Sequence, residues 1–519
     1  MSALERVVAR MTEPSFYLPS PPSVEVRETH VSVVFLAGDR AYKVKKPVRM
    51  PFLDYSTLER RRHFCHEEVR LNQRFAPDIY LGVRSIAEHD GDFALAEAED
   101  PAALEYAVAM RRYDEEATLE QLVEAGAADA GLAERIGTRV ADLHAAAPRA
   151  PAGHWTPADV AGRLDENFDT TRTEIGALVD PFTHGAVRRF SHTFLRSHTA
   201  LLERRIAAGM VRDVHGDLRA EHVVVEPHGL SLVDCVEFDD RLRRIDVAAD
   251  LAFLTMDLER LGAPLLAEAA ERAYVARTGD AELDGLLAFY ACYAAWVRAK
   301  VTGLRIRQLG QGDPARPRLE RRARALFALS LRLAWRARLP LLVVLCGVAG
   351  SGKSTLAAEL SRRSGLPHLS SDRVRKELAG ISPDTRGPPE LYTPEFTSRT
   401  YRELAARAEA ALTAGTGAIV DATFHRAEQR APLHQIGARA LWVECTAPEG
   451  TLRARAAIRE RAPEHGSDAT WPVAAEQRAA WEPLEEVAPG DRHELRTDRP
   501  VDACLDELDS FVSAAVDGG

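Results

Sequence analysis

Residues 347–354 read GVAGSGKS, and this stretch decides the fold of the C-terminal part of the chain. It matches the pattern Gly-x4-Gly-Lys-Ser at every fixed position, follows the apolar run 341–346 and opens a helical segment. Glycines let main-chain N–H groups curl around phosphates, and the helix N-terminus adds partial positive charge. Lys353 is expected to bridge the β- and γ-phosphates of a nucleotide and to act in catalysis, and Ser354 to hold Mg²⁺. We expect the phosphate contacts from Gly347, Gly350, Ser351, Gly352, Lys353, Ser354 and Thr355.

Strand-like and helical segments alternate around this motif. Apolar runs at 341–346, 418–421 and 439–444 are separated by helical stretches at 354–364 and 399–414. This order predicts an α/β P-loop NTPase domain in which helices cover a parallel sheet. Asp421 ends the second apolar run, where its carboxylate can orient Mg²⁺ through water; a buried aspartate that caps a loop is the alternative.

Two arginines follow the last of these strands. Arg455 and Arg459 are four positions apart, so a helix places them on one face. There they can clamp the transferring phosphoryl group as catalytic residues of a closing lid, or they can be solvated helix arginines.

Residues 341–486 resemble the P-loop "predicted kinase" AAA-type family related to gluconate kinase, zeta toxin and polynucleotide kinase. The resemblance is carried by GVAGSGKST (347–355), SSDRVRKEL (370–378) and VDATFHRAEQR (420–430). It implies that Asp372 accepts the proton of an attacking hydroxyl and that Arg375 binds the acceptor, although Asp372 alone could also be a helix N-cap. It further implies that Arg426 and Arg430 lie near the acceptor pocket.

A second group of motifs lies in the N-terminal part. Residues 215–222 read HGDLRAEH, so His222 follows Asp217 by five positions, and Asp234 ends a hairpin strand 17 positions after Asp217. These spacings are close to those of a protein-kinase catalytic loop and its metal-binding aspartate. Asp217 is therefore expected to orient and deprotonate an acceptor hydroxyl, and His222 and Asp234 to bind the metal.

A lysine and a glutamate upstream complete this pattern. Alternating residues predict two strands, at 31–36 and 41–45. Lys43 lies on the second of them, as a lysine that orients ATP does in kinases, and Lys45 shares its face and is a rival. The helical stretch 58–74 supplies Glu68 as the partner of that lysine, with Glu67 as the alternative. Exposed lysines and glutamates are usually solvated, so these two positions are informative only together with the downstream motifs.

Residues 31–300 resemble the aminoglycoside phosphotransferase-like (choline-kinase-like) fold, also through IDVAADLA at 245–252, where Asp250 is expected to be structural. The resemblance implies an α+β protein-kinase-like bilobal domain. The chain departs from the family pattern at two places. His222 stands where family members commonly carry Asn, and imidazole suits Mg²⁺ less well than an oxygen ligand. No glycine-rich phosphate loop is apparent, because residues 37–39 form only a tight turn.

We expect three parts: a kinase-like domain at 1–310, an Arg-rich linker helix at 311–339 and the P-loop domain at 340–519. The linker helix has an apolar stripe formed by Leu319, Ala323, Leu326, Ser330 and Ala334. We expect this helix to be a connector, solvated or docked on an acidic surface, rather than a nucleic-acid or membrane patch.

Composition narrows the class of protein. The 67 Lys and Arg against 78 Asp and Glu give a net charge of −11, which argues against a protein that coats nucleic acid. Six scattered cysteines without a Cys-x-x-Cys pair predict reduced thiols. The first ten residues carry charges too early for a signal peptide, and no apolar run approaches the ~18 residues of a membrane span. We therefore expect a cytoplasmic protein with no membrane contact.

Together the motifs predict an ATP-dependent phosphotransferase with two Mg-ATP sites, which moves the γ-phosphoryl group to a hydroxyl of a small metabolite. One alternative is that one domain is a nucleotide-sensing, regulatory pseudokinase module. Another is that the P-loop domain is a polynucleotide 5′-hydroxyl kinase, against which the acidic net charge counts.

Overall fold

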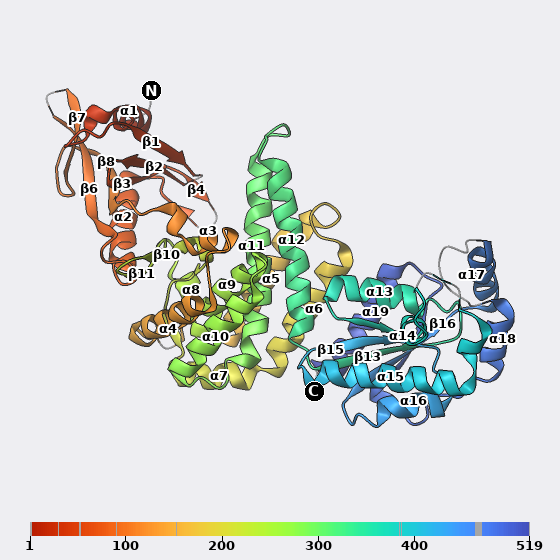
Figure 1. Ribbon diagram of the computed structural model, residues 1–519. Helices are drawn as coiled ribbons and strands as arrows, with labels where there is room; N and C mark the ends of the chain where they lie inside the picture. The colour runs from red at the N-terminus through yellow and green to blue at the C-terminus, as the bar shows by residue number, and fades with distance from the viewer. Residues whose placement is uncertain are drawn as a thin grey trace. The chain divides into compact units, whose positions relative to one another are not determined.

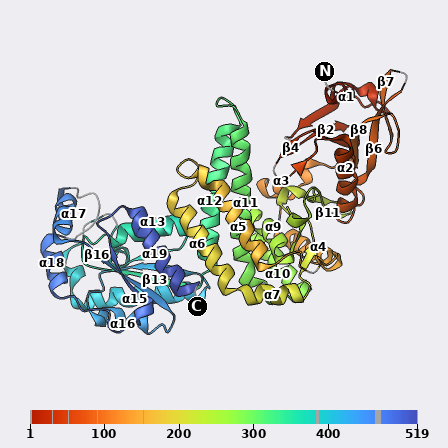
Figure 2. The same ribbon diagram turned by 180° about the vertical axis from the view of Figure 1, so that it is seen from behind.

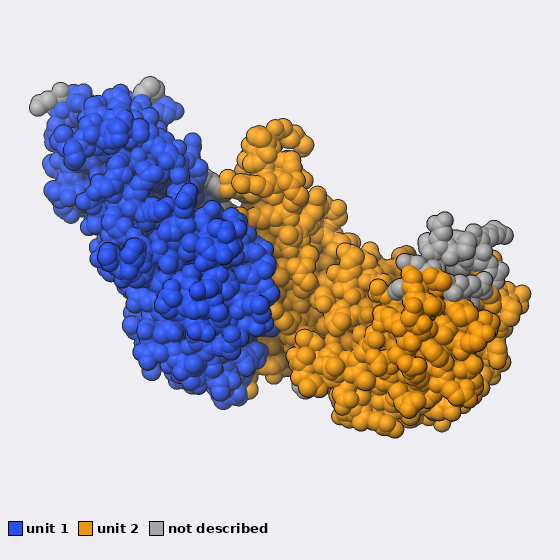
Figure 3. Space-filling view, viewed as in Figure 1, with its two compact units in different colours: residues 1–160, 201–294 blue, residues 161–200, 295–519 orange. Residues whose placement is uncertain are grey.

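The computed structural model describes residues 3–29, 31–50, 53–89, 91–151, 153–382, 385, 387–461 and 470–517. Contacts within the chain divide it into two units: Met1–Val160 with Leu201–Ala294, and Ala161–Ala200 with Ala295–Gly519 (Figure 3). Helices α5 (Pro157–Thr171), α7 (Thr199–Ala207) and α11 (Asp284–Gln308) contain the points where the chain passes from one unit to the other. The domain boundaries expected at residues 310 and 340 stay predictions beside this division.

The first unit begins with a six-stranded antiparallel sheet in the order β1-β2-β3-β8-β6-β7 (Figure 1). The two strands expected at 31–36 and 41–45 are its β2 and β3, joined by a turn in which Gly38 has φ +61°. The strands are β1 (Val24–Glu28), β2 (Ser32–Ala37), β3 (Arg40–Lys45), β6 (Tyr80–His89), β7 (Asp92–Glu97) and β8 (Ala103–Arg111), with the short pair β4 (Arg49–Met50) and β5 (Leu53–Asp54).

Helix α2 (Leu58–Asn72) packs against β6 and β8 of this sheet. Its N-cap Thr57 accepts a hydrogen bond from the Arg60 main chain, which satisfies one free N–H of the first turn. Cys65 and Val69 bury one side of the helix in an apolar cluster with the sheet. The same packing turns Glu68 inward, and this places a carboxylate over the face of β3.

Helices and two short strand pairs form the rest of the first unit. Helices α4 and α10 pack so closely that a Cβ on Gly137 would lie 2.1 Å from the carbonyl oxygen of Ala270, so only glycine fits there. The sheet lobe and this helical part give the expected α+β protein-kinase-like bilobal fold. The elements are α1 (Ala3–Met11), α3 (Leu119–Glu124), α4 (Ala130–Ala146), β9 (Val211–Asp213), β10 (Val223–Glu226), β11 (Gly229–Leu232), α8 (Asp240–Arg243), β12 (Arg244–Asp246), α9 (Val247–Arg260) and α10 (Pro264–Thr278).

The second unit contains a five-stranded, fully parallel sheet in the order β14-β15-β13-β16-β17, which confirms the predicted α/β P-loop fold. Every residue of β13 is buried, as expected for a central strand covered on both faces. Helices α13 (Lys353–Ser364) and α19 (Val501–Val516) lie on one side of the sheet. Helices α15 (Pro394–Thr413) and α16 (Ala427–His434) lie on the other (Figures 1 and 2). The strands are β13 (Leu341–Cys346), β14 (His368–Ser370), β15 (Gly417–Asp421), β16 (Ala440–Thr446) and β17 (Arg492–Arg496).

Long helices complete this unit. The expected linker helix is α12 (Arg316–Arg336), and all five residues of its predicted apolar stripe are buried. Just after it, Arg338 is buried and contacts Asp509 at 2.7 Å and Asp517 at 2.8 Å, which ties this end of the helix to α19. The helices are α6 (Pro181–Ser197), α13 (Lys353–Ser364), α14 (Ser371–Leu378), α15 (Pro394–Thr413), α16 (Ala427–His434), α17 (Glu449–Arg461), α18 (Trp471–Ala479) and α19 (Val501–Val516).

Within the described residues, no helix is both long enough and apolar enough to cross a bilayer. All six cysteine side chains are buried.

Candidate functional sites

The loop 347–352 between β13 and α13 has a backbone that only glycine can supply. Gly350 and Gly352 have φ +84° and +88°, in the left-handed region. A Cβ on Gly352 would lie 3.0 Å from Thr497 Oγ1, and one on Gly347 would lie 2.5 Å from the carbonyl oxygen of Cys445. The loop is therefore shaped by main-chain atoms, and its amides and the start of α13 form a phosphate cradle.

Polar atoms without partners gather at this cradle, which together with Asp421 we call the P-loop site. Within the described part of the chain, Asp421 Oδ1 and Ser351 Oγ are buried and have no hydrogen-bond partner. Asp421 pairs with Leu345 across β15 and β13, beside the start of the loop. Lys353 Nζ has only a long contact, 3.5 Å, to the carbonyl oxygen of Val348. Buried unsatisfied oxygens are costly, so this donor and acceptor set fits a phosphate chain with a hard cation.

Ser354 and Thr355 lie in the first turn of α13 with their side chains exposed, so both hydroxyls are accessible.

Asp372 lies in the first turn of α14, close to the P-loop site. The neighbouring strands pair Ser370 with Asp421, so α14 begins beside that carboxylate. Asp372 is half-exposed, and its Oδ2 is 3.0 Å from Nζ of the buried Lys376. Lys376 is a positive neighbour that the sequence did not single out.

Arg375, expected to bind the acceptor, is engaged inside the protein. Its Nη1 donates to the carbonyl oxygen of Leu391 at 2.6 Å and to Thr397 Oγ1 at 3.1 Å, and its guanidinium lies over the ring of Tyr392. In this arrangement Arg375 fixes the segment 391–397 against α14.

Arg455 lies against the P-loop. Its Nη1 donates to the carbonyl oxygen of Gly350 at 3.1 Å, and its Nη2 donates to that of Thr497 at 2.6 Å. Arg455 thus supports the loop from the side of β17. Arg459 belongs to the same helix, α17, but its side chain lies outside the described residues.

The two arginines of the 420–430 motif differ in exposure. Arg426 is half-exposed and lies 3.6 Å from Glu428. Arg430 is fully buried, contacts the carboxylate of Glu486 and donates at 2.8 Å to the carbonyl oxygen of Phe424. Arg430 therefore holds the loop that follows β15 rather than facing an open pocket.

Gln477 of α18 contacts the P-loop, and the sequence did not predict this contact. The main-chain N–H of Ala349, inside the P-loop, donates to Gln477 Oε1 at 2.8 Å. No spacing rule links residues so far apart in the sequence, so only the fold could identify this contact.

In the first unit, Lys43, Glu68 and Asp234 form a chain of ion pairs; with Asp217 we call them the front site. Lys43 Nζ lies 2.8 Å from Glu68 Oε1 and 2.8 Å from Asp234 Oδ1. The charge of Lys43 holds the pKa of Asp234 well below its usual range. Burial alone would lower the pKa of Lys43, but Asp234 and Glu68 outweigh it and raise that pKa well above normal. All three groups are therefore charged at neutral pH.

Lys45 is the second lysine on Glu68, at 2.5 Å from Oε2. It is completely buried and also lies 2.5 Å from Glu237, which accepts a hydrogen bond from the Tyr55 hydroxyl. The other candidate glutamate, Glu67, points away and pairs with Arg70. The structure thus brings Lys43 and Glu68 together with Asp234, and places Lys45 behind them with Glu237, which the sequence did not suggest.

The 215–222 segment is held by a buried carboxylate. Asp250 accepts hydrogen bonds from the main chains of His215, at 3.2 Å, and Gly216, at 2.7 Å, and from His144 Nε2 at 3.0 Å. Gly216 has φ +84°, and a Cβ there would lie 2.9 Å from the carbonyl oxygen of Leu242. Asp250 therefore has a supporting position.

Asp217, the expected base, is paired. Arg219 Nη2 donates to Asp217 Oδ2 at 2.9 Å, and Arg219 also contacts His222. Burial and the charge of Arg219 lower the pKa of His222 to about 4, so this ring is neutral at pH 7. Among the described residues, no three His, Cys, Asp or Glu side chains gather closely enough to form a metal site by themselves.

Both sites contain a residue in an uncommon backbone conformation. Asp234 at φ +62° and Phe424 at φ +50° are the non-glycine residues with positive φ in the described part of the chain. Phe424 follows Asp421 by three positions, and Asp234 carries the front-site carboxylate itself. Such strain is concentrated at functional sites because the surrounding contacts must maintain it.

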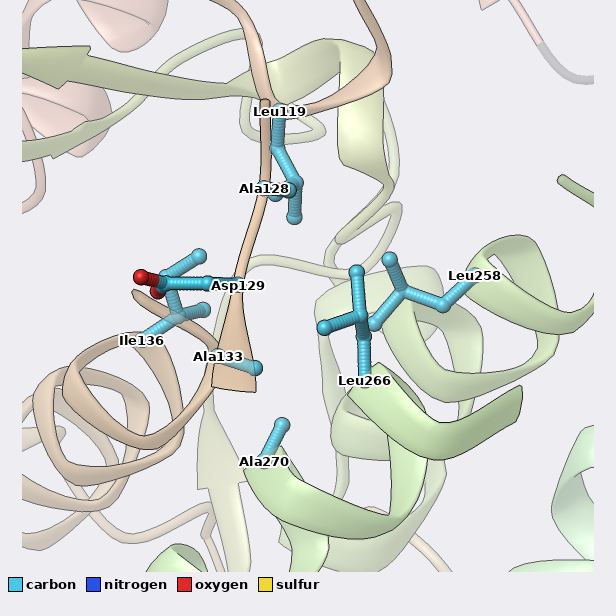
Figure 4. Close-up of a pocket in the computed structure, with 8 residues that line it drawn as sticks. All are labelled: Leu119, Ala128, Asp129, Ala133, Ile136, Leu258, Leu266 and Ala270. Carbon is cyan, nitrogen blue, oxygen red and sulfur yellow. The ribbon is translucent and has the colours of Figure 1, made fainter. Parts of the chain in front are cut away.

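An open hollow of about 510 Å³ lies in the first unit at the segment that follows β8. Tyr113 is one of its lining residues; burial and the nearby charge of Asp234 raise the pKa of its hydroxyl. Tyr113 therefore lies within electrostatic range of the front-site carboxylate Asp234. A second, apolar pocket between α4, α9 and α10 has no room for water, and its aspartate, Asp129, is occupied in capping α4 (Figure 4).

Known proteins are similar to the P-loop part of the chain and to most of its length. The family model described as an AAA domain matches residues 342–484. The uncharacterized protein Rv2004c of Mycobacterium tuberculosis is 33% identical over 429 residues, which cover 80% of this chain and 82% of that protein.

Solved structures are similar to parts of the chain. A sugar kinase from a Janibacter species is 23% identical and covers 33% of this chain and 94% of its own, with a TM-score of 0.28. A choline/ethanolamine kinase family protein from Mesorhizobium loti is 14% identical and covers 64% of this chain and 99% of its own, with a TM-score of 0.38.

Proposed function

The chain belongs to the family of the mycobacterial protein Rv2004c, and we propose that it is an ATP-dependent phosphotransferase with two sites. Each site would move the γ-phosphoryl group of ATP to a hydroxyl of a small metabolite. The P-loop site and the front site are built from different residues in different units, so each can carry a reaction of its own.

The observation that carries this proposal is the pair of buried oxygens without partners at the P-loop, Asp421 Oδ1 and Ser351 Oγ, within the described residues. Leaving such atoms unsatisfied costs about 1–3 kcal/mol each. A phosphate chain with Mg²⁺ would bring the missing donors and ligands. The loop amides, Lys353 and Ser354 would hold that group, and Mg²⁺ when bound would neutralise charge on the phosphates.

Asp372 is the proposed base of the P-loop site. The acceptor O–H would give its proton to the Asp372 carboxylate while its oxygen bonds to the γ-phosphorus, and the bond to the β-phosphate oxygen breaks to release ADP. Lys376 Nζ, 3.0 Å from Asp372 Oδ2, would hold this carboxylate in place for the step. Arg426, half-exposed, remains the proposed contact to the acceptor, while Arg375 and Arg430 would shape the pocket from inside.

The front site would use Asp217 in the same role. Lys43, held by Glu68, would orient ATP phosphates, and Asp234 would hold Mg²⁺, which would neutralise charge on those phosphates. The hollow beside Tyr113 is where the nucleoside would enter.

A second candidate applies to the front site alone. Because Arg219 occupies the Asp217 carboxylate, the first unit could bind nucleotide without transferring a phosphoryl group and regulate the P-loop site.

The test is ATP consumption by the full chain over a library of sugars, nucleosides and amino alcohols, with phosphorylated products identified by mass spectrometry. We expect Lys353→Ala and Asp217→Asn each to lose a different product and the double variant to lose all of them. Arg362→Ala, exposed on α13, is the matched control and should behave as the wild type. The proposal fails if no acceptor raises ATP consumption above the double variant. If Asp217→Asn keeps every product, the regulatory candidate is preferred.

A further inference from the structure

The hydrogen bonds of His222 allow one assignment of its proton. Nδ1 lies 2.8 Å from the carbonyl oxygen of Asp217, and a carbonyl can only accept, so Nδ1 carries the proton. Nε2 lies 3.0 Å from Nη2 of Arg219, and a guanidinium can only donate. The ring is therefore the neutral Nδ1–H form, with the lone pair of Nε2 directed at Arg219.

Arg219 is fixed by the groups around it. Its Nε is 3.1 Å from each carboxylate oxygen of Asp217, and its Nη2 is 2.9 Å from Oδ2. Nη1 contacts Glu221, and the residue is 6% exposed. Because His222 accepts from the same Nη2, the guanidinium is held in one plane across the carboxylate of Asp217.

Asp234 makes no hydrogen bond to His222, whose Nε2 accepts from Arg219. Its Oδ2 lies 3.7 Å from His222 Nε2, beyond hydrogen-bonding distance, and the only lone pair of that ring is engaged by Arg219. Mg²⁺ prefers oxygen ligands. Of the two residues expected to bind the front-site metal, Asp234 fits that ion and His222 does not.

We propose that His222 is a positioning residue that fixes Arg219 across the carboxylate of Asp217, and that it is not a ligand of the metal. The inference rests on the proposed function of the front site. Of the two residues expected to bind the metal, it leaves Asp234 as the ligand. It also means that Asp217 is held in an ion pair with Arg219 when an acceptor hydroxyl approaches, and that His222 sets the geometry of this pair.

The first test observes the proton directly and needs no turnover. The full chain carrying Lys353→Ala, which silences the P-loop site, is labelled with ¹⁵N in its histidine side chains. His222→Gln identifies the His222 resonances by their loss. We expect a protonated Nδ1, an unprotonated Nε2, and no shift of Nε2 when MgCl₂ is added to the complex with a non-hydrolysable ATP analogue. A proton on Nε2, or a shift that appears with the metal but not with the analogue alone, overturns the proposal.

The second test compares variants in the same background. Mn²⁺ affinity in the presence of the ATP analogue, measured by electron paramagnetic resonance, should change less than about threefold in His222→Leu and fall at least about tenfold in Asp234→Asn. His228→Leu, exposed in the β10–β11 turn, is the matched control. Equal losses in His222→Leu and Asp234→Asn overturn the proposal.

Rescue separates positioning from simple packing. His222→Gln keeps a side-chain carbonyl that can accept from Arg219, so it should retain more front-site turnover than His222→Leu, and equal loss in both counts against the proposal. Absence of any nucleotide-dependent Mn²⁺ binding in the Lys353→Ala chain would refute the proposed function of the front site, while the tautomer of His222 would still decide this inference.

Discussion

Gln477 Oε1 lies 2.8 Å from the main-chain nitrogen of Ala349, so helix α18 supplies a neutral acceptor to an amide inside the P-loop. Amides of this loop are the groups that phosphate oxygens need. A phosphate that binds the N–H of Ala349 must therefore displace the Gln477 side chain when the site is filled.

This contact predicts opposite effects of two substitutions at one position. Gln477→Ala should raise ATP affinity at the P-loop site about fivefold, because a hydrogen bond worth about 1 kcal/mol no longer has to be broken. Gln477→Glu should lower the affinity, because its negative charge would lie beside the phosphates. Calorimetry in a Lys43→Ala background isolates the P-loop site. Glu476→Ala, exposed on the same helix, is the control. Weaker binding by Gln477→Ala would show that the contact supports the site instead.

Arg455 offers a prediction that separates support of the loop from a role in the transition state. Because its guanidinium binds the carbonyl oxygens of Gly350 and Thr497, Arg455→Met should loosen the loop and weaken ATP binding about tenfold with little change in kcat. Binding isotherms and the steady-state kcat of P-loop turnover check this. A large fall in kcat at unchanged affinity would instead restore Arg455 as a clamp on the transferring group.

The sequence best predicts structural features that are formed by contiguous residues. The P-loop and its flanking strand and helix lie within 25 residues, and each glycine, lysine and serine is fixed by local chemistry. Alternation predicts β2 and β3, but not β1, β6, β7 or β8, which belong to the same sheet. Four of the six strands are thus not predicted from the local pattern.

The sequence does not fully predict the roles of residues whose partners come from distant segments. The sequence favours Glu68 but leaves Glu67 open as the alternative, and the packing of α2, which buries Glu68, decides between them. In the sequence, Arg430 is a polar residue of a helical stretch. In the structure, the loop that follows β15 and Glu486 enclose its side chain. Gln477 and Glu237 carry no motif at all, because their roles arise from tertiary contacts.

The two front-site lysines should respond differently to removal. Lys45→Met leaves the buried Glu68 and Glu237 without a common cation and should lower the free energy of unfolding by about 3–5 kcal/mol. Lys43→Met removes a partly accessible charge and should mainly weaken ATP binding at the front site. Urea unfolding and nucleotide titration of both variants give the comparison, with Lys46→Met, at the end of the same strand, as the control. Equal destabilisation by Lys43→Met and Lys45→Met would contradict this division.

Glu444 predicts how stability depends on pH. Burial and the neighbouring Glu494, its partner in register across β16 and β17, raise the pKa of Glu444. The folded state then binds more protons than the unfolded state between the two pKa values, so the free energy of unfolding falls as pH rises through that window. In Glu444→Gln the side chain is neutral, so its burial removes no charge from water.

Thermal unfolding should therefore show Glu444→Gln more stable than wild type at pH 8, with the gain shrinking toward pH 4, where the carboxyl is protonated in both states. Glu428→Gln, exposed in α16, should show no such pH dependence. A gain of equal size at pH 4 and pH 8 would mean that packing, and not the buried charge, limits stability at this strand.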